Sequence, residues 1–189
     1  MATRDTILDA AAQVMRQRGL AATTTREIAR AAGYSEATLY KNFTDKQDLF
    51  LAVLRERLPP LGRLDDLVGQ DTVTENLTRI VTRLIRFYAE SFPTAASLFS
   101  QPGLLADHRA AMASRGAGPR HPVQAVVGYL RAEQDEGRLG QETDVEAVGA
   151  LLAGAAFQHA FFVSFEETTE LTGVEDWAAR LVQAAGPFL

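Results

Sequence analysis

The chain has no cysteine among its 189 residues and few aromatic residues, 8% of the total. The absence of cysteine excludes a disulfide framework and a thiolate metal site. The three histidines, His108, His121 and His159, lack the spacing of metal ligands, and the sequence has no glycine-rich phosphate loop. We therefore expect no metal, no cofactor and no catalytic residues, and the sequence argues against an enzyme.

Long apolar runs are also scarce. No stretch approaches the roughly 18 residues that a membrane-spanning helix needs. The first 20 residues carry several charges within an amphipathic pattern, which is not the pattern of a signal peptide. Hydrophobic residues make up 47% of the chain, as in a folded globular protein. We expect a soluble cytoplasmic protein with no membrane partner.

The formal net charge of −5 is unevenly distributed. Residues 1–57 hold nine Lys and Arg against seven Asp and Glu, a net of +2, whereas residues 58–189 have a net of −7. The part of the chain suited to nucleic acid is therefore the N-terminal part. Because the excess is small, we expect specific contacts instead of sequence-blind electrostatic binding.

The N-terminal part has the signals of several short helices. Apolar residues recur at helical spacing from Ile7 to Met15, and Gly19 is expected to end that helix. Thr24 and Glu27 have the spacing of a capping box, which predicts a second helix that Gly33 ends.

A third helix follows at once. Ser35 is a natural N-cap for a helix that runs to Asn42. Thr44 and Gln47 predict a further capping box before another apolar helix. Two short helices joined by a tight glycine turn are the layout of a helix-turn-helix, so residues 1–57 are interpreted as a DNA-binding domain.

The joint spacing of these residues is specific: Gly19, Thr24, Thr25, Ile28, Ala29, Ala32, Gly33, Ser35, Ala37, Thr38, Leu39, Tyr40, Phe43, Lys46 and Leu49. With this spacing the first third of the chain resembles the DNA-binding domain of the tetracycline-repressor-like (TetR) family of bacterial regulators. The remaining two thirds is similar to that family only in length, helicity and organisation. Two features depart from its pattern: Tyr34 in the turn, and the pair Pro59-Pro60.

The resemblance implies which residues meet DNA. The implied phosphate contacts are Thr25, Ser35, Tyr40 and Lys46. The candidates for reading base edges are Arg26, Glu36, Ala37, Thr38, Lys41 and Asn42. Glu36 has an alternative role as a first-turn acidic residue that stabilises its own helix. A dimer of such units would read a palindromic operator, with half-sites about one helical turn or a multiple of it apart.

The rest of the chain also has an all-α pattern, with no sign of strands. Helices are expected at 72–92, where Pro93 stops the first, and at 94–100, 103–113, 121–136, 144–166 and 174–185. Residues 114–119 have the composition of a loop. Pro59-Pro60 and Gly62 mark a joint, so residues 58–189 are interpreted as one helical domain for effector binding and dimerisation.

The helix at 144–166 is apolar on two sides, so it must be buried from more than one direction. With the last helix it is suited to an intersubunit four-helix bundle, an arrangement that the resemblance also implies. The predicted dimer-interface residues are Val148, Leu152, Ala155, His159, Phe162, Trp177 and Leu181. The alternative is that both helices are simply the core of one protomer.

The larger domain gathers most of the aromatic residues, and an inducer site is implied by the resemblance. The predicted ligand-binding residues are Phe87, Tyr88, Phe92, Phe99, Tyr129, Phe157, Gln158 and Phe161. Composition favours a small apolar or amphiphilic effector of unknown identity. We expect the protein to act as a repressor, because members of the family tend to be repressors. Two alternatives stay open: a DNA-binding dimer without an effector, and a structural helical interaction protein.

Overall fold

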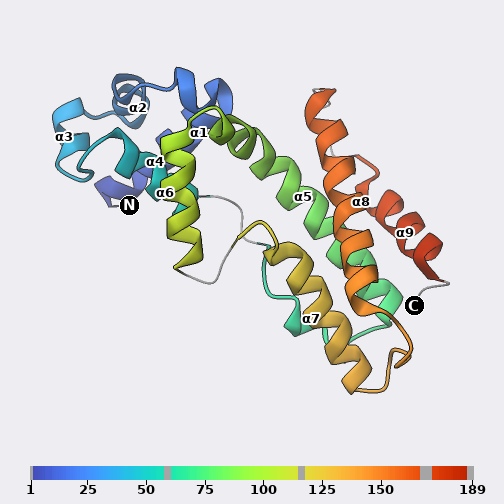
Figure 1. Cartoon of the computed structure of the whole chain (residues 1–189). Coiled ribbons are helices and arrows are strands. Elements are labelled where there is room, and N and C mark those ends of the chain that lie inside the picture. Colours follow the sequence, from blue (N-terminus) through green and yellow to red (C-terminus); the bar gives the residue numbers. More distant parts are fainter. Residues whose placement is uncertain (1, 58–60, 115–117, 167–171, 187–189) are drawn as a thin grey trace. The chain divides into compact units, whose positions relative to one another are not determined.

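The computed structural model describes residues 2–57, 61–114, 118–166 and 172–186. Within these ranges every regular element is helical and no strand is present, as the sequence predicts. Figure 1 labels the α-helices. They are α1 (Thr3–Ala22), α2 (Thr25–Ala32), α3 (Glu36–Tyr40), α4 (Lys46–Glu56), α5 (Val73–Phe99), α6 (Pro102–Ala113), α7 (His121–Asp135), α8 (Val145–Phe165) and α9 (Val174–Ala185), with a 3-10 turn η1 (Asp65–Leu67) before α5.

The chain forms two compact units. Unit 1 comprises residues 1–59 and 91–116, and unit 2 comprises residues 60–90 and 117–189. The sequence-based interpretation placed its boundary after residue 57 and assigned residues 91–116 to the second part, whereas these residues lie in unit 1. Leu98 and Leu104 explain the difference, because both are buried in the same apolar cluster as Leu49 and Phe50. The functional roles given to the two parts remain predictions.

The expected helix end before Pro93 is wrong, because α5 continues for 27 residues with Pro93 inside it. A proline within a helix removes one backbone hydrogen bond and crowds the preceding turn. Here Pro93 itself is exposed, whereas Thr94 and Leu98 beyond it are each only 4% exposed. Burial of these side chains in unit 1 offsets the local cost of the proline.

The helix ends follow the local signals in most places. The capping box of Thr24 and Glu27 is formed in both directions, and Gly33 adopts a φ of 75° at the end of α2. Gly19 interrupts α1 with a φ of 72°, as expected from its position. The expected box of Thr44 and Gln47 is wrong, since Asp45 is the N-cap of α4 and accepts from the Asp48 amide at 2.8 Å. Aspartate caps a helix well, and its charge also favours the helix N-terminus.

Unit 2 is built around α8. The helix packs on α7 and on α9, and the first part of α5 completes the core (Figure 1). Gly149 permits the close approach of α7, because a Cβ placed there would lie 2.6 Å from Val127 Cγ2. The predicted joint at residues 59–60 and part of the predicted loop at 114–119 lie outside the described residues.

Helix α8 is also long and apolar enough to cross a membrane, by length and composition alone. The expectation that no segment reaches this length is therefore wrong. Only 33% of the apolar window is buried within the structure. One such helix is weak evidence for a membrane span, because the core helix of a globular protein can have the same length and composition.

Candidate nucleic-acid interface

Helices α1 and α4 support the helix pair α2–α3. Arg57, which follows α4, binds Asp9 at 2.6 Å and Asp5 at 2.9 Å, both on α1. Arg4 on α1 binds Glu56 at 2.7 Å. Hydrogen bonds from the Arg4 and Arg55 guanidinium groups lower the pKa of Glu56 to about 2. These ion pairs join α1 to α4 on the outside of a core that contains Ile7, Leu8 and Leu49.

The turn between α2 and α3 is fixed by backbone and side-chain hydrogen bonds. The Tyr34 amide donates to the Ala29 carbonyl at 2.9 Å, which closes the end of α2. Ser35 caps α3 by accepting from the Thr38 amide at 3.2 Å, as predicted. Leu39 and Phe43 are buried, so the opposite side of α3 remains open to solvent.

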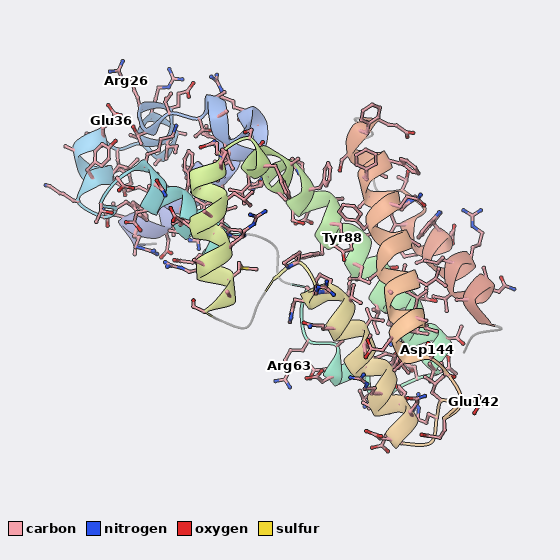
Figure 2. The ribbon with its side chains drawn as sticks, viewed as in Figure 1. Arg26, Glu36, Arg63, Tyr88, Glu142 and Asp144 are labelled. Atoms are coloured by element: carbon pink, nitrogen blue, oxygen red, sulfur yellow. The ribbon has the colours of Figure 1, made fainter. Side chains whose placement is uncertain are left out.

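The predicted DNA contacts gather on this open side. Tyr40 is 48% exposed, and its hydroxyl donates to Thr25 Oγ1 at 3.3 Å. Lys41 and Ala37 are exposed as well. The structure thus brings the candidate residues of α2 and α3 together on one surface, shown with side chains in Figure 2. Their contacts with DNA remain predictions.

Two candidates have different surroundings from those expected. The regular part of α3 ends at Tyr40, and the Asn42 side-chain amide donates to the Thr38 carbonyl at 2.9 Å. That bond uses one of the two N–H groups of the amide and directs the side chain towards its own helix. Lys46 is the first residue of α4, and its ammonium lies 5.0 Å from the centre of the Phe50 ring. The ring holds the lysine near the start of α4, where an anion is favoured.

The predicted ligand-binding residues fall into separate groups. Phe87, Tyr88 and Phe157 form a chain of edge-to-face contacts with ring centres 5.3 Å apart. Burial raises the pKa of Tyr88, labelled in Figure 2, to about 12. Phe92 and Phe99 belong to unit 1, where Phe99 is 69% exposed. Gln158 and Phe161 are on the exposed side of α8.

Tyr129 differs from the other aromatic candidates because it is fully buried in unit 2. Burial and the nearby Glu133 carboxylate raise the pKa of its hydroxyl. Glu133 is also fully buried, and its Oε2 lies 2.8 Å from Arg138 Nε. Sequence reasoning missed this polar core, although Glu133 stands at helical spacing from Val126 and Tyr129 on an otherwise apolar face of α7.

The predicted dimer-interface residues are divided between core and surface. Val148 and Leu152 are 3% and 0% exposed within the protomer, so their side chains pack in its own core, and their part in a dimer interface stays a prediction. The buried contacts with α7 on this side explain the difference. Ala155, His159, Trp177 and Leu181 are half-buried, and Phe162 is 48% exposed. His159 stacks on Trp177 with ring centres 4.3 Å apart, and burial lowers the pKa of His159.

The other side of α8 is apolar and exposed. Its largest members are Leu151 at 47%, Phe157 at 45%, Phe161 at 37%, Phe162 at 48% and Phe165 at 76% exposure, and of these only Phe162 was predicted as an interface residue. The small residues Ala147, Ala150 and Gly154 are exposed in the same helix. An exposed apolar stripe of this kind is typical of an interaction surface.

The capped helix pair, its glycine turn and the supporting helices α1 and α4 define a helix-turn-helix protein of the DNA-binding class. Residues 7–53 match the family described as "Bacterial regulatory proteins, tetR family". The chain is 30% identical over 144 residues to the HTH-type transcriptional regulator YvkB of Bacillus subtilis (strain 168), which covers 76% of this chain and 74% of that protein. The protein belongs to the TetR family of bacterial regulatory proteins, and it is a DNA-binding transcriptional regulator.

Two further similarities add detail. The N-terminal part is 43% identical over 67 residues to the HTH-type transcriptional repressor KstR2 of Rhodococcus jostii (strain RHA1), covering 35% of this chain and 30% of that protein. A crystal structure of the transcriptional regulator FadR from Bacillus subtilis, in complex with stearoyl-CoA, has a TM-score of 0.66. That similarity covers 95% of each chain at 16% identity, so it concerns the fold alone. Among the described residues no cluster of His, Asp and Glu side chains could hold a metal ion.

Proposed function

We propose that the protein is a cytoplasmic repressor that binds a palindromic DNA operator as a homodimer and releases it when a small apolar or amphiphilic ligand binds unit 2. The observation that carries the DNA-binding part is the open side of α3. There Tyr40 and Lys41 are exposed, and Lys46 stands at the start of the capped helix α4. We infer no catalytic activity, in keeping with the regulators to which the chain is similar.

The roles of the side chains follow from their chemistry. Ser35 and Lys46 would donate to phosphates and orient α3, and Lys41 would donate to a base edge in the major groove. The Thr25 and Tyr40 hydroxyls would also donate to phosphates once they leave Glu36 and Thr25, to which they donate in the free protein. Repression is supported by the name of the relative from Rhodococcus jostii, a transcriptional repressor. A dimer fits a palindrome because each protomer presents one such surface.

The DNA assignment is tested by selecting genomic fragments with the purified protein at physiological salt and sequencing what is retained. We expect a palindromic motif. Lys46→Ala should lower affinity for this motif on the order of tenfold, because a charge-assisted hydrogen bond to phosphate is lost. It should also reduce the salt dependence without changing the preferred sequence. Lys41→Ala should instead change the preference at one base pair of each half-site.

Arg109→Ala is the matched control for these variants, because it removes one positive charge from α6, outside the helix-turn-helix. It should leave both affinity and preference near those of the unmodified protein. Unchanged binding by Lys46→Ala and Lys41→Ala alike would refute the assigned surface. Failure of the unmodified protein to enrich any motif would contradict the proposed function itself.

The effector part is tested by thermal unfolding with a panel of apolar and amphiphilic compounds. Stearoyl-CoA is a suitable first probe, since the FadR structure contains it. A ligand that binds the folded protein at a hundred times its Kd adds about 2.7 kcal/mol to stability. A true effector must also weaken DNA binding, because it acts only through different affinities for two states.

Tyr88→Ala should reduce the shift of the unfolding temperature, since Tyr88 joins Phe87 and Phe157 in the aromatic group. His121→Ala is the control, because it removes an exposed ring at the start of α7 that is not among the predicted ligand-binding residues. If no compound both stabilises the protein and releases DNA, the alternative of a DNA-binding dimer without an effector is favoured.

A further inference from the structure

One carboxylate links several of the candidate DNA contacts. Thr25 Oγ1 donates to Glu36 Oε1 at 2.8 Å, and the Tyr40 hydroxyl donates to Thr25 Oγ1 at 3.3 Å. The second oxygen of the same carboxylate, Glu36 Oε2, lies 3.8 Å from Arg26 Nε. Figure 2 labels Glu36 at the start of α3 and Arg26 on α2. Glu36 therefore joins the two helices of the helix-turn-helix at the surface that faces DNA.

Glu36 places a negative charge on the surface that is proposed to bind DNA, which is itself negatively charged. Its position in the first turn of α3 favours a negative charge, because of the free amides at a helix start. That effect accounts for an acidic residue but not for the pairing with Arg26, whose side chain is 87% exposed. A carboxylate also repels the phosphates of an approaching duplex, so it opposes binding that depends only on the DNA backbone.

The geometry of the pair leaves Arg26 able to read a base. The contact uses Nε, and the outer edge of a guanidinium is the part that forms two parallel hydrogen bonds with O6 and N7 of guanine. A free arginine on the surface loses much rotamer freedom when it is fixed on DNA. A carboxylate that restrains the arginine side chain before DNA binds reduces this loss of rotamer freedom. It also disfavours rotamers in which the arginine contacts a phosphate.

We propose that Glu36 is a specificity-determining positioning residue, which acts by holding Arg26 for the reading of a guanine in each half-site. Glu36 does not contact the base itself in this arrangement. The inference rests on the proposed function, because it requires that the α2–α3 surface binds operator DNA. It adds that discrimination at one base pair depends on a contact between two protein side chains.

The test compares binding of the full-length protein to the selected operator and to operators substituted at each position. The variants are Arg26→Ala, Glu36→Gln and the double variant. Glutamine keeps the size of the side chain and can still accept from Thr25, but it loses the charge that holds Arg26. We expect Arg26→Ala and Glu36→Gln to reduce discrimination about tenfold at the same base pair. The double variant should lose little more than either single variant, as coupled residues do.

Glu36→Gln should also raise affinity for unrelated DNA severalfold, since one repulsive charge per protomer is removed. Glu136→Gln, an exposed residue after α7, is the control for the change in net charge and should alter neither quantity. Thermal unfolding checks that each variant is folded. Arg26→Lys provides a second measurement, because it keeps the charge but lacks the planar guanidinium. This variant should lose discrimination at the same base pair, as Arg26→Ala does.

Three results would overturn the inference. An effect of Glu36→Gln at a different base pair from that of Arg26→Ala would indicate that Glu36 reads a base directly. Unchanged discrimination at every position would reduce Glu36 to stabilising its own helix. Additive losses in the double variant would show that the two side chains act independently. If the unmodified protein selects no motif at all, the proposed function fails, and this inference fails with it.

Discussion

Leu151→Glu is expected to convert the proposed homodimer to monomers and to lower affinity for a palindromic operator by at least a hundredfold. Leu151 lies in the first half of α8 and is 47% exposed. In a twofold interface the substitution places one carboxylate from each protomer into an apolar contact, and burying an unpaired charge is costly. A monomer engages one half-site only, so the gain from binding two linked sites is lost.

Sedimentation or light scattering measures the oligomeric state of this variant, and a DNA titration measures its affinity. Gln124→Glu is the matched control, because it adds the same charge at an exposed position of α7. It should leave the dimer and its DNA affinity intact. A dimeric Leu151→Glu protein that still binds the operator would show that α8 does not form the interface through this side.

The choice of this side of α8 comes from the structure and not from the sequence. Both rows of the helix are apolar, so helical periodicity predicts that both are buried. It does not tell whether each row packs on the same protomer or on a partner. The row with Val148 and Leu152 is covered by the protomer's own core. The row with Leu151 and Phe165 is left at the surface. The row that packs inside the protomer is decided by the position of α7. That position is a property of the tertiary structure, and no short sequence pattern predicts it.

The helix-turn-helix was far more predictable, because its signals are local. A capping box, a glycine with positive φ and a serine N-cap each act within four residues, and Thr24, Gly33 and Ser35 all behave as predicted. The prediction at Thr44 was wrong because two neighbouring residues can cap this helix, and Asp45 is the N-cap in the structure. The failure at Pro93 has a different origin. The local cost of a proline is outweighed by burial of Leu98 in a core formed by residues distant in sequence.

The side-chain contacts within the candidate DNA-binding surface also could not be predicted from local sequence signals. The sequence placed Arg26, Glu36 and Tyr40 on two helices with a known relation, so their common surface could be expected. The hydrogen bond from Thr25 to Glu36 and the pairing of Glu36 with Arg26 could not, because they depend on side-chain conformation across the turn. The same is true of the buried Glu133, whose partner Arg138 lies beyond the end of α7.

Gly149→Ala is expected to destabilise unit 2 by about 1–3 kcal/mol, although alanine is the better helix former. The new Cβ would lie 2.6 Å from Val127 Cγ2 and 3.5 Å from the Val127 amide nitrogen. Val127 is 4% exposed, and its branched side chain has few alternative rotamers. The clash must therefore be relieved by a shift of α7 against α8, which disturbs the packing of the whole core.

Urea unfolding at one fixed protein concentration measures this effect, because the proposed dimerisation would make the apparent stability depend on concentration. Val127→Ala removes the clashing methyl group, so the double variant should be more stable than the sum of the two single losses predicts, by about 1 kcal/mol or more. Gly128→Ala on α7 is the matched control. A Cβ there meets no atom within 4 Å, so helix propensity alone should act and raise stability by up to about 1 kcal/mol. A Gly149→Ala protein as stable as the unmodified one, with no coupling to Val127, would mean that α7 and α8 are not in close contact at this point.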